Sequence, residues 1–282
     1  MSTPCNPPLE IESYRLNKKT IHVIRDDYLD AGTKQRGQKF FHLISSRGYS
    51  GVVTIAATTG YGQVATSVMA MRARLKAFII VPYEVPVNPM TERVKRMNDS
   101  HYIVVTRGDH KLRYVDPIVN QLVELDDGYP NDPSSNTTVS NSLMELVLHH
   151  FGQRHQLYEL SLGLDDPDYI RALVDALLEQ VGSLQPARLW ITVGSGTILT
   201  ALKTLWPTTE FICVQVGRDI SGVMTRLGIP LENRYVSRYK FAQSIGKKER
   251  PPFPSLANYD AKAWTFIDKN GKHGDYFWNV AG

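Results

Sequence analysis

Cysteine is scarce in this sequence, and long apolar runs are missing. Only Cys5 and Cys213 occur among its 282 residues, so a disulfide framework is not expected and a reducing compartment fits. No stretch of about 18 apolar residues is present, which argues against a membrane-spanning helix. The opening residues MSTPCNPPLE contain neither the basic nor the apolar segment of a signal peptide. These absences predict a cytoplasmic protein that does not engage a membrane.

Metal-ligand spacing and a strong charge of one sign are also lacking. Among the eight histidines, His149, His150 and His155 lie close together in the chain but lack the helical i, i+4 spacing of a zinc site, so no metal is expected. The formal net charge of +4 suits an anionic ligand or substrate and is small for a dedicated nucleic-acid binder. With 42% hydrophobic and 21% charged residues, the composition is that of a globular protein.

The sequence does contain a regular alternation of short apolar runs with amphipathic stretches. Most of the apolar runs lack polar alternation, as strands covered on both faces do. We therefore expect parallel strands at residues 20–25, 51–57, 76–82, 101–106, 188–193 and 210–216. Helices are expected at residues 34–47, 62–75, 90–98, 141–151, 167–182 and 197–206. The order strand, helix, strand, helix predicts an α/β fold with two doubly wound, open-sheet lobes.

One break in composition divides the chain. Residues 126–142, DDGYPNDPSSNTTVSNS, are rich in Asn, Ser, Pro and Thr and are typical of a long loop or crossover. The sequence therefore predicts a smaller α/β lobe at residues 51–125. Residues 1–50 and 126–282 are expected to form a larger lobe together.

A glycine turn follows the expected strand at 188–193. Gly194, Ser195, Gly196 and Thr197 lead directly into a helix, so backbone N–H groups, two hydroxyls and the positive end of a helix dipole face one spot. This arrangement suits a phosphate group, and the alternative is an ordinary helix start with a Ser or Thr cap. The turn is neither a Walker loop nor a dinucleotide-binding loop, because the lysine of the first and the third glycine of the second are missing.

A second polar turn opens the expected helix at 62–75. Thr58, Thr59, Gly60 and Tyr61 follow a buried strand, and Gln63 lies near the helix start. Such a turn can hold an anion, and a substrate carboxylate is one candidate. A simple capping turn is the alternative.

A lysine occupies a third turn. In RDDYLDAGTKQRG, residues 25–37, Lys34 lies where a strand-like run gives way to a helix-like one. Taken alone, this stretch is better explained by a solvated surface lysine than by a reactive one. The order of all three turns along the chain therefore decides its interpretation.

In that order, the turns resemble those of the fold type II pyridoxal-phosphate enzymes, the group of tryptophan synthase β, cysteine synthase and threonine dehydratase. The stretch RDDYLDAGTKQRGQKF is similar to the RDD…GGNKxRKLE motif of the 1-aminocyclopropane-1-carboxylate deaminase and D-cysteine desulfhydrase branch. The resemblance spans nearly the whole chain and implies the cofactor pyridoxal 5'-phosphate, held by the larger lobe. A short member of the phage type is one form of this resemblance.

The resemblance also implies roles for individual residues. Lys34 would form the Schiff base with the cofactor aldehyde, which requires an unprotonated amine in a partly desolvated crevice. The segment NYDAKAW is similar to the Y-E-G-K segment of the deaminase branch, so Asp260 would face the pyridine nitrogen and Tyr259 would lie beside the ring. The implied cofactor-binding set is completed by Gly194, Ser195, Gly196, Thr197 and Thr59. The implied substrate-binding residues are Thr58, Thr59, Gly60, Tyr61 and Gln63.

Three functions remain open at this point. The first is a lyase that acts at the α-carbon of an amino-acid group through an external aldimine, by decarboxylation or by elimination with deamination. The second is a decarboxylase that tailors amino-acid-modified thymine in phage DNA, so that the partner is a modified nucleotide or DNA. The third is a non-catalytic protein of the same fold that binds a phosphorylated ligand. Members of the group are commonly dimers, so the resemblance implies a homodimer, although no stretch of the sequence identifies an interface.

Overall fold

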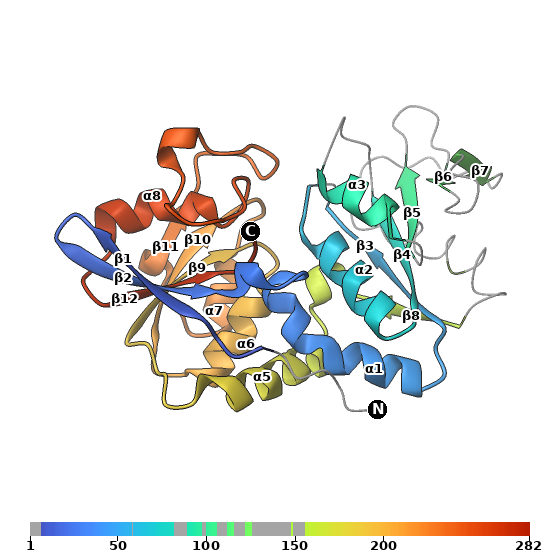
Figure 1. Cartoon of the computed structure of the whole chain (residues 1–282), viewed down its shortest axis with the longest axis horizontal. Coiled ribbons are helices and arrows are strands. Elements are labelled where there is room, and N and C mark those ends of the chain that lie inside the picture. Colours follow the sequence, from blue (N-terminus) through green and yellow to red (C-terminus); the bar gives the residue numbers. More distant parts are fainter. Residues whose placement is uncertain are drawn as a thin grey trace. The chain divides into compact units, whose positions relative to one another are not determined.

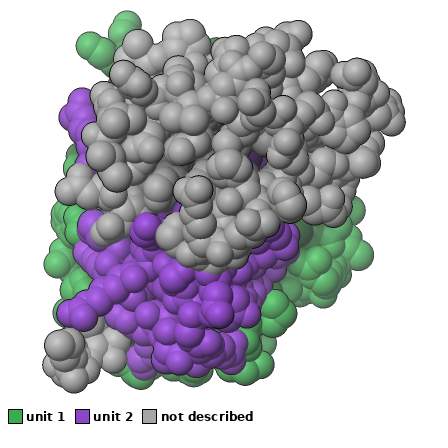
Figure 2. All heavy atoms as spheres, turned by 90° about the vertical axis from the view of Figure 1, so that its right-hand side faces the viewer, with its two compact units in different colours: residues 1–37, 167–282 green, residues 38–166 purple. Residues whose placement is uncertain are grey.

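The computed structural model describes residues 7–57, 59–81, 89–97, 100–105, 112–115, 122–125, 148 and 156–282. The chain divides into two compact units, of which unit 1 comprises residues 1–37 and 167–282 and unit 2 comprises residues 38–166. Figure 2 shows the atoms of the two units in green and purple. Each unit is built around its own six-stranded sheet.

Unit 1 holds a sheet with the strand order β1-β2-β12-β9-β10-β11 (Figure 1). Its strands are β1 (Ile11–Leu16), β2 (Lys19–Arg25), β9 (Arg188–Val193), β10 (Glu210–Gln215), β11 (Arg234–Val236) and β12 (Asp275–Asn279). All of them except the edge strand β1 run parallel. The last strand of the chain thus inserts between β2 and β9, which brings the C-terminal residues to the middle of the sheet.

Helices cover both faces of this sheet. They are α5 (Pro167–Val181), α6 (Thr197–Leu205), α7 (Ser221–Arg226) and α8 (Ala261–Asn270). Phe277 packs with Trp190, Trp264 and Ile267 under α8, whereas the next residue of β12, Trp278, meets Trp206 beyond the end of α6. Successive residues of a strand point to opposite faces, so β12 contributes to both cores. Figure 1 shows α8 on one side of the sheet and α5 and α6 on the other.

Short 3₁₀ segments connect the elements of unit 1. They are η1 (Asp26–Tyr28), η2 (Gly32–Gly37), η4 (Leu231–Asn233) and η5 (Lys247–Glu249). The first two follow β2 and replace the start of the helix expected at 34–47. Lys34 therefore lies in a tight 3₁₀ turn rather than on a regular α-helix.

Unit 2 holds a second mixed sheet with the order β7-β6-β5-β4-β3-β8. Its strands are β3 (Gly51–Ile55), β4 (Lys76–Val81), β5 (Ser100–Val105), β6 (Leu112–Val115), β7 (Leu122–Leu125) and β8 (Leu157–Leu160). The helices described in this unit include α1 (Gln38–Ser46), α2 (Gly62–Arg72) and α3 (Pro89–Lys95), and η3 (Leu162–Leu164) follows β8. Strands β3, β4, β5 and β8 run parallel, which is the open α/β arrangement that the sequence predicts.

The domain boundaries differ from those expected at 50/51 and 125/126. The units divide at 37/38 and 166/167. Helix α1 belongs with unit 2 because the Gln38 amide donates to the Met69 carbonyl oxygen of α2 at 2.9 Å. Strand β8 belongs there too, because it pairs with β3. The helix expected at 141–151 lies outside the described residues, apart from residue 148.

Candidate active site

The carboxyl ends of five parallel strands lie along one edge of the unit 1 sheet. Chain segments that follow strand ends at such an edge form the ligand crevice of open α/β sheets. Lys34 follows β2, the Gly194–Thr197 turn follows β9, and residues 280–282 follow β12. The sheet topology therefore gathers the two turns of unit 1 and the C-terminus at the same edge.

The backbone around Lys34 is fixed by the C-terminal segment. Gly32 has φ +56°, and a Cβ there would lie 2.3 Å from the Val280 carbonyl oxygen, so only glycine fits. The Thr33 N–H donates to that same oxygen at 3.0 Å, and the Trp278 indole donates to the Thr33 hydroxyl at 2.7 Å. The position of Lys34 thus depends on the last strand of the sheet.

A buried ion pair closes the other side of this turn. The Arg36 guanidinium donates to the Asp26 carboxylate, at 3.0 Å from Nε to Oδ1, and both side chains are almost fully buried. The neighbouring Asp27 carboxylate accepts two hydrogen bonds from Arg25, at 2.8 and 2.7 Å. The charged residues of the motif around Lys34 therefore hold the turn in place. The amine of Lys34 is the group of this motif that can react as a nucleophile.

Two lysines of unit 1 have pKa values lowered by burial. Desolvation lowers the pKa of Lys34 to about 8, and it lowers the pKa of Lys262 to about 8 as well. The Lys262 ammonium donates to the carbonyl oxygens of Lys240 and Phe241, at 2.8 and 3.2 Å. A lowered pKa alone therefore does not single out a reactive lysine. The two differ in their surroundings, because Lys34 lies in the 3₁₀ turn after β2, whereas Lys262 lies in the first turn of α8 and is held by two loop carbonyls.

The lowered pKa predicts the pH range in which Lys34 reacts. Its amine is unprotonated above a pKa of about 8, so acetylation by acetic anhydride should reach half its maximal rate near that pH. A lysine with the ordinary pKa of 10.5 would still accelerate well above pH 9. Peptide mass spectrometry measures the rate at Lys34, with the exposed Lys269 as internal control. A midpoint for Lys34 close to 10.5 would contradict the desolvated environment.

The Gly194–Thr197 turn has the geometry of an anion cradle. Gly196 is the residue before α6 and has φ +94°. A Cβ on Gly196 would lie 2.7 Å from the Val223 side chain, so this left-handed position needs glycine. A Cβ on Gly194 would lie 3.0 Å from the Tyr259 hydroxyl, a close contact that the tyrosine side chain would have to relieve. The Ser195 and Thr197 hydroxyls lie 3.1 Å apart at the helix start. A glycine turn of this kind at a helix start can offer backbone N–H groups, hydroxyls and the positive end of the helix dipole to an anion.

Asp260 is the most unusual acid of this edge. Its side chain is fully buried before α8, and burial raises its pKa well above the ordinary value, which favours the protonated carboxyl. Oδ2 accepts a hydrogen bond from the Ala281 N–H at 3.1 Å. Oδ1 has no hydrogen bond of ordinary geometry with any described residue. The Thr192 hydroxyl is near enough to favour the charged form slightly, but it does not form such a bond either.

A continuous series of contacts connects these residues. The Lys34 turn bonds to Val280, the adjacent Ala281 bonds to Asp260, and Tyr259 packs on Gly194. The Tyr259 hydroxyl also donates to the Thr192 carbonyl oxygen at 3.4 Å, and burial raises its pKa. Unit 1 therefore brings its predicted site residues together around its C-terminal segment.

The polar turn of unit 2 has its own local order. Gly60 N–H donates to the Ala57 carbonyl oxygen at 2.8 Å, and the Gln63 amide donates to the same oxygen at 3.3 Å. Tyr61 is the residue before α2, so the turn opens this helix as expected. Thr59 lies in the turn, whereas Thr58 falls outside the described residues.

Arg218 joins the site although the sequence motifs did not identify it. Its guanidinium donates to the Ser195 carbonyl oxygen at 2.8 Å and to the Gly194 carbonyl oxygen at 3.4 Å. These bonds hold two carbonyls of the turn and bring a positive charge beside it. The signal was available, because Arg218 follows the end of the expected strand at 210–216 and strand ends share one edge.

Comparisons with known proteins agree on the fold. The chain is similar to the solved structure of an ACC deaminase homologue (TM-score 0.69, 14% identity, covering 98% of this chain and 90% of that chain). It is also similar to a pyridoxal 5'-phosphate-dependent aspartate racemase (0.52, 11%, 96% and 73%) and to diaminopropionate ammonia lyase from Escherichia coli (0.54, 12%, 99% and 86%). At such low identities the similarity establishes the fold alone. It confirms the predicted fold type II architecture and the similarity in fold to the deaminase branch.

Comparison by sequence finds less. No protein-family model matches the chain, and no curated protein sequence matches it. Within the described part of the chain, no helix has the length and apolar character of a membrane span. The same residues contain no group of three or more His, Cys, Asp or Glu side chains placed to hold a metal ion. His149, His150 and His155 lie outside the described residues.

Proposed function

We propose that this protein is a pyridoxal-phosphate-dependent lyase that acts at the α-carbon of an amino-acid group. One observation carries the proposal: a desolvated lysine, Lys34, and a buried acid, Asp260, lie at the same sheet edge, and Oδ1 of Asp260 accepts no hydrogen bond from a described residue. The fold supports it, since the aspartate racemase of the same architecture is named as dependent on this cofactor. The names of the other two neighbours, a deaminase homologue and an ammonia lyase, favour a deaminating lyase.

The residues present fit the cofactor in three respects. Asp260 offers a carboxyl with a raised pKa, and its Oδ1 lacks a partner among the described residues, which suits a pyridine nitrogen. A Cβ at Gly196 would collide with Val223 and one at Gly194 would press on Tyr259, so the two glycines leave bare backbone, which suits a phosphate. Lys34 offers an amine that is partly unprotonated at neutral pH, which suits an aldehyde.

When bound, the cofactor supplies an aldehyde that links to amines and a ring that withdraws electrons from the α-carbon of the linked amino acid. Lys34 would bind the aldehyde and then carry the proton that leaves or returns at the α-carbon. Asp260 would give its proton to the ring nitrogen and remain as a carboxylate beside it. This exchange removes the cost of a buried carboxylate without a partner, because the new positive charge lies next to the negative one.

The remaining predicted residues would bind and orient. Gly194, Ser195, Gly196 and Thr197 would hold the phosphate, with Arg218 steadying the carbonyl side of the turn. Tyr259, packed on Gly194, would lie beside the ring. The unit 2 turn, with Thr58, Thr59, Gly60, Tyr61 and Gln63, would bind the substrate carboxylate at the start of α2, and Thr59 would also contact the cofactor.

The products of the reaction test this proposal. Purified protein supplied with pyridoxal phosphate is mixed with free amino acids, and ammonia and a keto acid are measured. Their formation at a rate that depends on Lys34 supports the deaminating lyase. Carbon dioxide released from an amino-acid-bearing nucleotide would instead support the second candidate, a decarboxylase that tailors modified DNA. Cofactor binding without turnover of either kind of substrate would favour the third function, a non-catalytic protein that binds a phosphorylated ligand.

The phosphate site gives a separate prediction. Gly196→Ala should weaken pyridoxal-phosphate binding about tenfold or more, because the new Cβ pushes against Val223 and the left-handed backbone is strained by about 1–2 kcal/mol. Gly228→Ala is a matched control, since Gly228 also has positive φ, +64°, but a Cβ there would meet no atom within 4 Å. Equilibrium dialysis of the cofactor measures both. Equal affinities of the two variants would place the phosphate elsewhere.

A further inference from the structure

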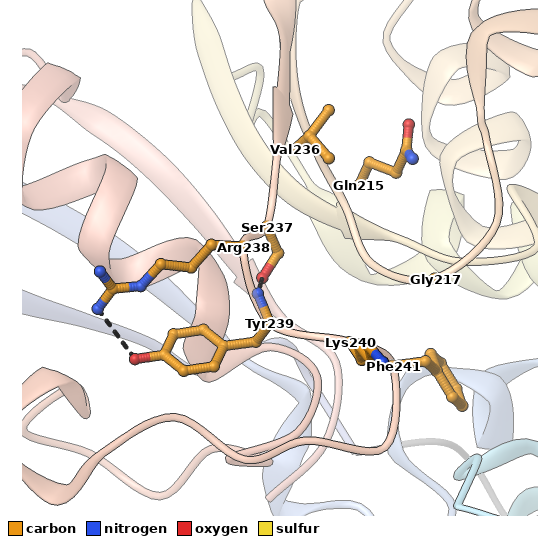
Figure 3. Close-up of a pocket in the computed structure, with 8 residues that line it drawn as sticks. All are labelled: Gln215, Gly217, Val236, Ser237, Arg238, Tyr239, Lys240 and Phe241. Atoms are coloured by element: carbon orange, nitrogen blue, oxygen red, sulfur yellow. Dashed lines mark hydrogen bonds between the residues drawn. The ribbon is translucent and has the colours of Figure 1, made fainter.

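A crevice lies between the carboxyl ends of β10 and β11, beyond the turn that holds Arg218. It has a volume of about 280 Å³ and is lined by Gln215, Gly217, Val236, Ser237, Arg238, Tyr239, Lys240 and Phe241 (Figure 3). Its size is at the lower end for small-molecule pockets, so it admits one group of a larger ligand. We call it the β10–β11 crevice.

The crevice adjoins the candidate active site through Phe241. The Phe241 ring packs against Gly217, where a Cβ would lie 3.0 Å from it, and it meets the Tyr259 ring edge-on at 6.3 Å between centroids. Tyr259 in turn packs on Gly194. Phe241 and Tyr259 thus connect the lining of the crevice to the Gly194 turn of the candidate site.

The positive charge of the chain is concentrated in this region. Residues 218–250 contain eight Lys or Arg and three Asp or Glu, a net charge of +5, whereas the whole chain has +4. The remaining residues therefore sum to −1. The structure describes every residue of this basic segment. Six of the eight residues that line the crevice, 236–241, belong to the segment. The field at the crevice is thus positive while the rest of the chain is nearly neutral.

The loop that forms the wall is held in a defined position. The buried Lys262 ammonium donates to the carbonyl oxygens of Lys240 and Phe241. Glu249 accepts hydrogen bonds from Arg238, at 2.6 Å, and from the Tyr239 hydroxyl, which places η5 beside the crevice. Burying an ammonium is costly unless it is well hydrogen-bonded. The two bonds from Lys262 therefore fix the position of this loop.

Several cations of the loop keep their charge uncompensated. Arg238 is paired with Glu249, and Arg234 is paired with Asp219. Lys240, Lys247 and Lys248 are exposed and form no ion pair with a residue that the structure describes. One carboxylate would be satisfied by a single cation, whereas a phosphate carries more charge and more acceptor oxygens.

We propose that the β10–β11 crevice and its rim of Lys240, Lys247 and Lys248 bind a phosphate group of the substrate. The inference rests on the proposed function for the statement that the ligand is a substrate. The phosphate can belong to a phosphorylated small molecule or to a nucleic-acid backbone, and both present the same chemistry to the rim.

The experiment compares two triple variants of the protein loaded with pyridoxal phosphate. The rim variant carries Lys240→Ala, Lys247→Ala and Lys248→Ala. The control variant carries Lys18→Ala, Lys269→Ala and Lys272→Ala, three exposed lysines at the opposite edge of the unit 1 sheet. Both variants lose the same net charge, so a difference between them reports on location. The probes are inorganic pyrophosphate and a labelled short DNA duplex of mixed sequence, measured by calorimetry and by fluorescence anisotropy at several salt concentrations.

We expect the rim variant to bind at least one probe about tenfold or more weakly than the control variant, with a salt dependence reduced by up to about three phosphate contacts. A loss confined to pyrophosphate identifies a small phosphorylated substrate, and a loss that includes the duplex identifies a nucleic-acid source. Equal binding by the two variants, or no binding of either probe by the wild type, overturns the proposal. The cofactor absorbance band is recorded in the same samples, so failure of the cofactor assignment is seen separately from failure of the rim.

Discussion

Lys34→Ala is expected to give a folded protein that loses covalent attachment of pyridoxal phosphate and turns over about a thousandfold more slowly or worse. The variant removes both the amine that would bind the aldehyde and the group that would carry the α-proton. The wild type should show an absorbance band at about 410 to 430 nm, typical of pyridoxal chemistry, and the variant should lack it. Since the Lys34 backbone is held through Thr33 and the Tyr169 hydroxyl, removing the side chain should leave the turn in place.

Lys262→Ala is the informative control for this variant. Burial lowers the pKa of both lysines to about 8, so a nonspecific reaction with the more acidic amines would involve either of them. We expect Lys262→Ala to be less stable, because two loop carbonyls lose their donor, and yet to keep the absorbance band. Loss of the band in Lys262→Ala, with the band retained in Lys34→Ala, would reverse the assignment.

Asp260→Ala should keep the covalent link to Lys34 and lose about a hundredfold or more in turnover. Removal of one well-placed electrostatic partner typically costs that much. Without the carboxylate, the ring nitrogen is no longer held in its protonated form, so the ring draws less charge from the α-carbon. Asp260→Asn should behave similarly, because a neutral amide has no negative charge with which to stabilise a protonated ring nitrogen. Absorbance spectra and initial rates measure the two effects on the same samples.

Asp275→Asn serves as the matched control for Asp260. Asp275 is also a buried aspartate of unit 1, but it begins β12 at the opposite end of the sheet, where it accepts hydrogen bonds from Trp190 at 2.7 Å and Arg188 at 3.0 Å. Its replacement should reduce stability and leave the turnover of the remaining folded protein near that of the wild type. If Asp260→Ala and Asp275→Asn reduce turnover equally, Asp260 has only a structural role.

The side chain of Asn279, the last residue of β12, is held by hydrogen bonds within unit 1. Its side-chain oxygen accepts a hydrogen bond from the Ser255 hydroxyl at 2.8 Å, and its amide nitrogen donates to the Pro254 carbonyl oxygen at 2.8 Å. These bonds fix the loop before α8 to the end of β12. Asp260 is therefore the better candidate for the pyridine nitrogen in this part of the fold.

The strands that the sequence predicts best are those with uninterrupted apolar runs. β9 lies at Arg188–Val193 as expected, and β10 ends one residue before the expected 216. These strands are covered on both faces, so each residue contributes to the same apolar signal. β1 and β12 were not expected, because β1 is a half-exposed edge strand and β12 begins with a buried aspartate whose partners lie far away in sequence.

The sequence predicts those parts of the candidate site that are formed by short, continuous turns. Lys34 and the Gly194–Thr197 turn are visible in short motifs, since backbone geometry requires glycine at fixed positions there. The environment of Asp260, whose Oδ1 has no hydrogen-bond partner in the described part of the chain, could not be predicted from the sequence, because it results from the packing of residues 280–282 beside α8. The position of Arg218 after the expected strand at 210–216 places it at the same sheet edge, but its bonds to the turn could not be predicted, since its carbonyl partners lie more than twenty residues away.

Peptide mass spectrometry after borohydride reduction tests the central claim most directly. The protein is incubated with pyridoxal phosphate, reduced, digested and searched for lysines that carry the reduced cofactor. The account predicts one modified peptide, containing Lys34, at close to one cofactor per chain, and no modification at Lys262. Cofactor found on another lysine instead, or on no lysine at all, would contradict the account.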